Sequence, residues 1–188
     1  MSLTPDEAAA TLREAEQIQH RSREMQIYRN SAPHCFIWGT VWLICYGTTG
    51  LAPRYAGTVW WILPFVGWLL AMIVGFYQGR TRRRSERNWR VDALMGIIFI
   101  AGIALGMVIA FPYGPLSGLR IGAAYPLFFS AIYAGFGLWV GIRYIILGAF
   151  VAVATLFGFF ILRENFAIWM AIVGGGSMIL CGFWMRRI

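Results

Sequence analysis

The segment that decides the fold is residues 58–90, which read TVWWILPFVGWLLAMIVGFYQGRTRRRSERNWR. Its first part, residues 58–78, carries no charged side chain. A membrane span needs about 20 predominantly apolar residues to cross roughly 30 Å of hydrocarbon. Arginines follow this apolar run directly, and arginine beside a span favours the cytoplasmic side. The segment therefore predicts a transmembrane helix that ends at the cytoplasm.

Five further apolar runs of similar length occur along the chain. The six predicted spans are residues 34–52, 58–78, 91–111, 121–141, 144–162 and 165–185. Composition agrees, because 59% of the residues are hydrophobic and only 13% are charged, whereas a soluble domain is about 25% charged. We therefore expect an all-α integral membrane protein, with a six-helix bundle over residues 34–188 behind a cytoplasmic tail over residues 1–33.

The distribution of arginine predicts the orientation of this bundle. All 16 basic residues are arginine, and thirteen of them fall on the side of the predicted bundle that holds both termini. The other side holds only Arg54, Arg120 and Arg163. Loops rich in arginine stay in the cytoplasm, so we expect a multi-pass protein of the bacterial inner (plasma) membrane with both termini inside. The connection at residues 141–143 is so short that spans four and five should be antiparallel neighbours.

The tail is predicted to form a helix of its own. Residues 4–7, Thr-Pro-Asp-Glu, combine an N-cap threonine, a proline at the first helical position and a glutamate in the first turn, which is typical of a helix start. We expect the helix to run to about Asn30. The sequence Ser31-Ala32-Pro33 is expected to break it before the first span.

One face of the predicted tail helix is thinly apolar, and its large side chains are Leu12, Ile18 and Met25. Gln17 falls on the opposite face. We favour packing of the apolar face on the chain's own cytoplasmic loop or on a second copy. A different protein partner and the membrane surface are the alternatives. Five acidic residues in the tail weaken the membrane reading, because anionic lipid would repel them.

The arginine-rich loop between the second and third spans is the densest charge in the chain. Its arginines are Arg80, Arg82, Arg83, Arg84, Arg87 and Arg90. The favoured interpretation is that they set the topology. Binding of anionic lipid headgroups is the functional alternative, worth about 1 kcal/mol per basic residue near such a membrane. We expect no nucleic-acid partner, because a short juxtamembrane run lacks a surrounding nucleic-acid-binding fold.

The predicted spans carry no ionisable group deep in the hydrocarbon. An ion-driven machine usually needs such groups, and the hydroxyls present can bond back to their own helices. His34 beside Cys35 has no carboxylate or further histidine near it in sequence, and the three cysteines follow no zinc pattern. We therefore expect no enzymatic site, no cofactor and no metal, and interpret the cysteines as small hydrophobic residues.

Small residues recur at helical spacing inside the predicted spans. The candidate helix-packing or hinge positions are Gly67, Ala71, Gly75, Gly102, Gly106, Gly174, Gly175 and Gly176. Small residues let membrane helices approach closely. The run at 174–176 is favoured as a packing feature, although three glycines could also bend the helix or open a ligand cavity beside Trp169.

These features favour a non-enzymatic membrane protein that acts by association. It would be a homo-oligomer in contact with membrane lipids, or the membrane subunit or anchor of a regulatory system, with a possible protein partner bound through the cytoplasmic tail. The alternative is an oligomeric transporter or channel for a neutral or apolar solute or lipid. The few interior hydroxyls and the three consecutive glycines support this alternative.

Overall fold

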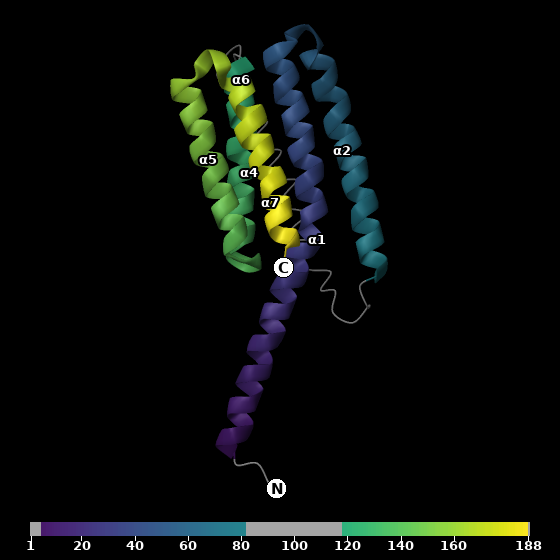
Figure 1. Ribbon diagram of the computed structural model, residues 1–188, viewed down its shortest axis with the longest axis vertical. Helices are drawn as coiled ribbons and strands as arrows, with labels where there is room; N and C mark the ends of the chain where they lie inside the picture. Colours follow the sequence, from purple (N-terminus) through teal and green to yellow (C-terminus); the bar gives the residue numbers. More distant parts are fainter. Residues whose placement is uncertain (1–4, 82–117, 188) are drawn as a thin grey trace.

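The computed structural model describes residues 5–81 and 118–187, and within these two ranges it is helical throughout, without a strand (Figure 1). The helices are α1 (Pro5–Leu51), α2 (Pro53–Thr81), α4 (Gly118–Val140) and α5 (Ile142–Ile161). A composite helix follows, made of the 3₁₀ turn η1 (Arg163–Asn165), α6 (Phe166–Trp169), the π-helical segment η2 (Met170–Gly175) and α7 (Gly176–Arg186).

Four described segments are long and apolar enough to cross a membrane. They are Pro53–Gly79, Gly118–Leu138, Ile142–Ile161 and Arg163–Arg186. Four of the six predicted spans are thus confirmed as helices of spanning length. The predicted first span lies inside α1 and is not among the four. The predicted third span, residues 91–111, lies outside the described residues.

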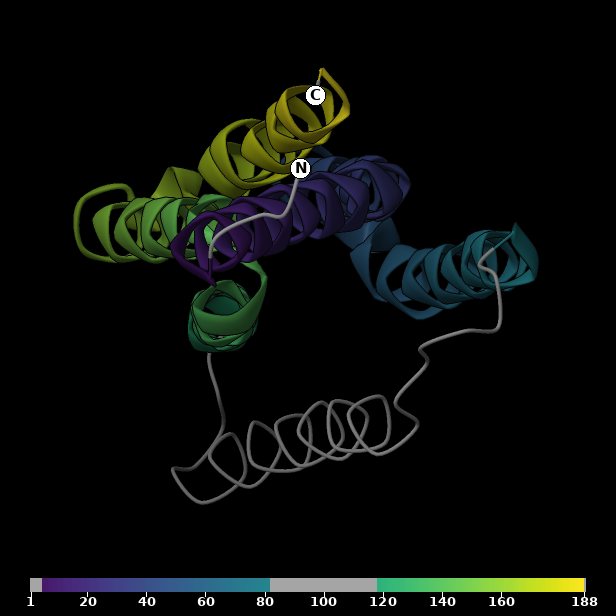
Figure 2. The same ribbon diagram turned by 90° about the horizontal axis from the view of Figure 1, so that it is seen from below.

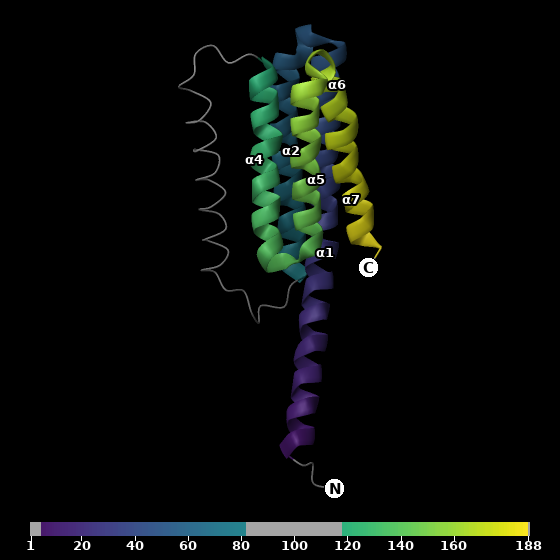
Figure 3. The ribbon, with the colours of Figure 1, turned by 90° about the vertical axis from the view of Figure 1, so that its left-hand side faces the viewer.

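α1 is the central helix of the described bundle. It contacts α2 on one flank, and α6, η2 and α7 on another (Figure 2). α4 and α5 form the closest pair, and they are antiparallel neighbours, as the short connection between them predicts. The N-terminal part of α1 projects beyond the bundle (Figures 1 and 3).

The two ends of the bundle hold different connections. The tail end, from which the N-terminal part of α1 projects, also holds the end of α2, the turn between α4 and α5 and the end of α7 (Figure 3). The opposite end holds the α1–α2 turn, the start of α4 and the turn at η1. α2 and α4 therefore begin at the same end of the bundle and finish together at the tail end.

The predicted break at Ser31-Ala32-Pro33 is wrong, because α1 continues through all three residues. Pro33 removes the helical hydrogen bond to the Arg29 carbonyl, and side chains donate to two other carbonyls nearby. The Ser31 hydroxyl donates to the Ile27 carbonyl at 2.8 Å, and the Gln78 side-chain amide of α2 donates to the Asn30 carbonyl at 2.8 Å. Neighbouring helices and serine side chains commonly support proline in membrane helices in this way. The tail is therefore a continuation of the first bundle helix.

A second proline explains the central hydrogen bond of the bundle. Pro126 has no N–H, so the Gly122 carbonyl one turn earlier in α4 loses its helical partner. The buried Tyr46 hydroxyl of α1 donates to that carbonyl at 2.7 Å. Tyr46 also makes edge-on ring contacts with Trp42 and Trp60. This side chain therefore joins α1 to α4 at a point where the α4 backbone needs a donor.

Replacing Tyr46 by phenylalanine should lower the free energy of unfolding by about 1 kcal/mol, because it leaves the Gly122 carbonyl without a donor in an apolar interior. The measurement is equilibrium unfolding of the full chain in mixed micelles, followed by circular dichroism as dodecyl sulfate is increased. Tyr125→Phe is the control, since that tyrosine is half exposed and should give no loss. Equal stability of both variants would contradict the assignment.

Candidate functional site

The tail face is the first candidate site, and we define it as Leu12, Ile18 and Met25. Their side chains are 65%, 62% and 45% exposed. α1 carries them away from the bundle on a single helix (Figure 1), and no described element covers them. The favoured prediction that this face packs on the chain's own loop has no support among the described residues. Within the described ranges the face is therefore uncovered.

The predicted arginine site falls largely beyond what the structure describes. Arg80 lies in the last turn of α2, and the remaining arginines of the loop lie outside the described residues. The arginine whose surroundings are most clearly defined is Arg143, at the start of α5. Its guanidinium lies over the rings of Tyr28 and Trp184, at 5.0 and 4.6 Å from their centroids, and donates to the Trp184 carbonyl at 3.1 Å. A cation held this way ties α1, α5 and α7 together at the tail end.

The predicted small-residue positions divide into tight and open ones. A β-carbon built at Gly175 would lie 2.8 Å from the Leu43 nitrogen and 2.9 Å from the Gly39 oxygen. One built at Gly67 would lie 2.8 Å from a Val41 methyl group, and one at Gly174 would lie 2.8 Å from the Met170 methyl group. These glycines sit where α1 meets α2 and where α1 meets η2.

The other members of that set are not in such contacts. A β-carbon at Gly75 or Gly176 would meet no described atom within 4 Å, and Ala71 is half-buried. Gly102 and Gly106 lie outside the described residues. Sequence reasoning missed Gly39, whose own β-carbon would lie 2.9 Å from the Gly175 oxygen. Gly39 has no small residue four positions before or after it, so the spacing pattern of small residues did not identify it.

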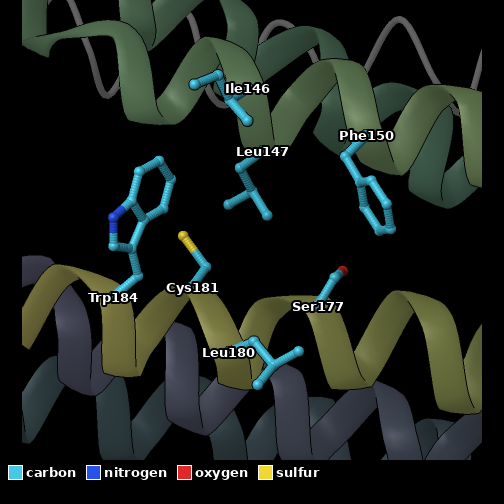
Figure 4. Close-up of a pocket in the computed structure, with 7 residues that line it drawn as sticks. All are labelled: Ile146, Leu147, Phe150, Ser177, Leu180, Cys181 and Trp184. Carbon is cyan, nitrogen blue, oxygen red and sulfur yellow. The ribbon is translucent and has the colours of Figure 1, made fainter.

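An apolar groove lies between α5 and α7, with a volume of about 230 Å³ (Figure 4). Its lining residues are Ile146, Leu147, Phe150, Ser177, Leu180, Cys181 and Trp184. The Ser177 hydroxyl is already used, because it donates to the Gly174 carbonyl at 2.9 Å. The groove therefore presents mainly hydrocarbon surface, with the Cys181 thiol and the Trp184 ring among its lining groups.

The cysteines are arranged in a way that the sequence did not reveal. Cys35 of α1 and Cys181 of α7 are close enough to interact electrostatically, and the Cys35 thiol donates to the Met185 sulfur at 3.9 Å. Cys45 is buried elsewhere on α1, with its thiol near the Val59 carbonyl. The predicted spans put Cys35 and Cys181 at similar depth near the inner face, but depth alone does not say which helices are neighbours.

No family model, curated protein or solved structure matches the chain. The chemistry of the described residues is therefore the basis for function. His34 belongs to no group of three histidine, cysteine or carboxylate side chains that could hold a metal within the described ranges. What these ranges offer is an exposed helical face, a hydrocarbon groove and a cluster of sulfur atoms.

Proposed function

We propose that this chain is a multi-pass inner-membrane protein that acts by association, with a second copy of itself or with a protein partner, through its cytoplasmic tail. The observation that carries the proposal is the tail face on the projecting part of α1. Ile18 and Met25 are large apolar side chains, and they are exposed on a part of α1 that the sequence predicts to lie in water. Burying such a side chain against a partner contributes about 1.5–3 kcal/mol.

The proposal includes six spans with both termini inside. α2 finishes at the tail end and α4 begins at the opposite end. One further crossing between them fits this arrangement, and residues 91–111 are long enough for it. The arginine distribution supports a cytoplasmic tail end. Protease added to right-side-out vesicles should spare both termini. In inverted vesicles it should remove the tail, and cleavage in the first preparation instead would refute the orientation.

Transport is the less favoured alternative, for a specific reason. The transport hypothesis requires a cavity at Gly174–Gly176. Gly175 instead lies in close contact with the backbone of α1. The space beside Gly174 is filled by the side chains of Met170 and Trp42. The groove between α5 and α7 lies at the side of the bundle and opens to its surroundings. These observations support a packed scaffold better than a pathway through the described helices.

Introducing a charge into the tail face should break the association. For Ile18→Glu we expect at least a 10-fold loss of the oligomer or of the copurifying partner, because a buried carboxylate without a partner costs more than 1.4 kcal/mol. The measurement is native mass spectrometry of the full chain extracted from its own membrane in lipid nanodiscs.

The matched control is Gln17→Glu, which adds the same charge one residue earlier on the opposite, exposed face. It should assemble as the unchanged chain does. Recovery of the unchanged chain as a monomer without a stoichiometric partner would refute the proposal. An equal loss in both variants would show a general charge effect and would refute the role of the tail face.

A further inference from the structure

Three sulfur atoms meet at the tail end of the bundle, between α1 and α7. The Cys35 thiol lies 3.9 Å from the Met185 sulfur, and Cys181 of the adjoining α7 is close enough to interact with it electrostatically. Cys181 and Met185 are four residues apart on α7 and therefore share one helix face. All three residues are buried. The packing of two helices thus brings together two thiols and a thioether in an apolar setting.

The separation of the Cys35 and Met185 sulfurs suits a metal ion held by three sulfurs. Metal–sulfur bonds of about 2.3 Å, the length found for zinc thiolates, place the sulfurs of a planar three-coordinate site roughly 4.0 Å apart. The Cys35–Met185 separation of 3.9 Å matches that value. Thiolate and thioether donors together select a soft monovalent ion such as Cu(I). Zinc would need a fourth donor, and no histidine or carboxylate completes such a set within the described residues.

The charge around the site also fits a monovalent ion. Two thiolates and one Cu(I) carry a net charge of −1, which is costly to bury unless it is paired. The Arg143 guanidinium acts electrostatically on Cys181 and is fixed over Tyr28 and Trp184. Its charge of +1 balances the complex. Loading the site breaks two S–H bonds, forms two Cu–thiolate bonds and one Cu–thioether bond, and releases two protons.

We propose that Cys35, Cys181 and Met185 form a binding site for Cu(I) at the tail end of the bundle. The groove between α5 and α7 gives access to it, because Cys181 and Trp184 line that groove (Figure 4). The expectation of no metal site rests on the spacing of histidine and cysteine along the sequence. Such spacing cannot detect a methionine thioether or a contact between helices that are distant in the sequence. The site is independent of the proposed association through the tail.

The test is a competition titration of the full chain, purified in detergent under reducing and anaerobic conditions. Cu(I) is supplied as its complex with bicinchoninate, whose colour fades as the protein removes the metal. We expect one Cu(I) per chain. X-ray absorption of the loaded protein should show sulfur neighbours alone at about 2.3 Å.

Variants locate the site. Cys35→Ser and Cys181→Ser should each weaken binding by about 100-fold or more, and Met185→Leu by about 10-fold. Cys45→Ser is the matched control, because it removes a buried thiol of α1 that lies outside the cluster, and its affinity should be unchanged. Met185→Leu conserves volume, so it keeps the test decisive if the serine variants do not fold.

Three results would overturn the proposal. The first is that the folded, unchanged chain removes no copper from the competitor. The second is nitrogen or oxygen neighbours in place of sulfur in the absorption spectrum. The third is a loss of affinity in Cys45→Ser equal to that in Met185→Leu.

Discussion

Gly175→Ala is expected to lower the free energy of unfolding by roughly 3 kcal/mol, at the upper end of the usual cost of overpacking. The added methyl group would lie 2.8 Å from the Leu43 nitrogen and 2.9 Å from the Gly39 oxygen. Both are backbone atoms of α1, so neither can rotate away as a side chain would. α1 and η2 would have to separate, and the contacts along their whole interface would loosen with them.

Gly176→Ala should have the opposite sign. A β-carbon there would meet no described atom within 4 Å, and alanine is about 0.8–1 kcal/mol more favourable than glycine inside a helix. The two substitutions are identical in chemistry and adjacent in sequence, so any general effect on expression or on lipid contact is shared.

The measurement is equilibrium unfolding of both variants in mixed micelles, followed by circular dichroism. The expected result is a loss of stability in Gly175→Ala and none in Gly176→Ala. Similar stability of the two variants would mean that the close approach of α1 and η2 is not what position 175 requires. A loss of stability in Gly176→Ala alone would mean that position 176, and not position 175, faces α1.

This contrast also marks how far the sequence reaches. Hydropathy predicts helices of spanning length because the hydrocarbon thickness fixes the number of apolar residues. A run of three glycines predicts a special place in the last span. It does not say which of the three touches another helix, because that depends on the rotation of the helix about its axis. Gly39, the partner on α1, has no small residue four positions away, and its role becomes evident only when the packing of the helices is known.

The candidate sites differ in the same way. The tail face follows from the 3.6-residue period, which is local information, and the structure leaves its residues exposed. The sulfur cluster joins Cys35 to residues about 150 positions away on α7, and no local pattern encodes that. Pro33 shows the converse error. Its local preference is to end a helix, and α1 nevertheless continues through it.

Gly141→Ala is the second substitution from which we expect a large loss, about 1–3 kcal/mol, and its cause is the backbone. Gly141 joins α4 to α5 with φ 141° and ψ 165°, and it is the one residue of the described ranges with a positive φ. That region of backbone space is open essentially to glycine alone. The sequence predicts a tight connection here, but not that its geometry excludes every other residue.

Asparagine separates this explanation from a simpler one. A glycine that merely occupies the left-handed helical region, near φ +57°, can be replaced by asparagine at little cost. A φ of 141° lies far beyond that region, so Gly141→Asn should lose as much stability as Gly141→Ala in the same unfolding measurement. Gly135→Ala in α4 is the control, since a β-carbon there meets no described atom within 4 Å. Rescue by asparagine would show that the turn relaxes to a left-handed conformation, and that the closest helix pair of the bundle tolerates a different hairpin.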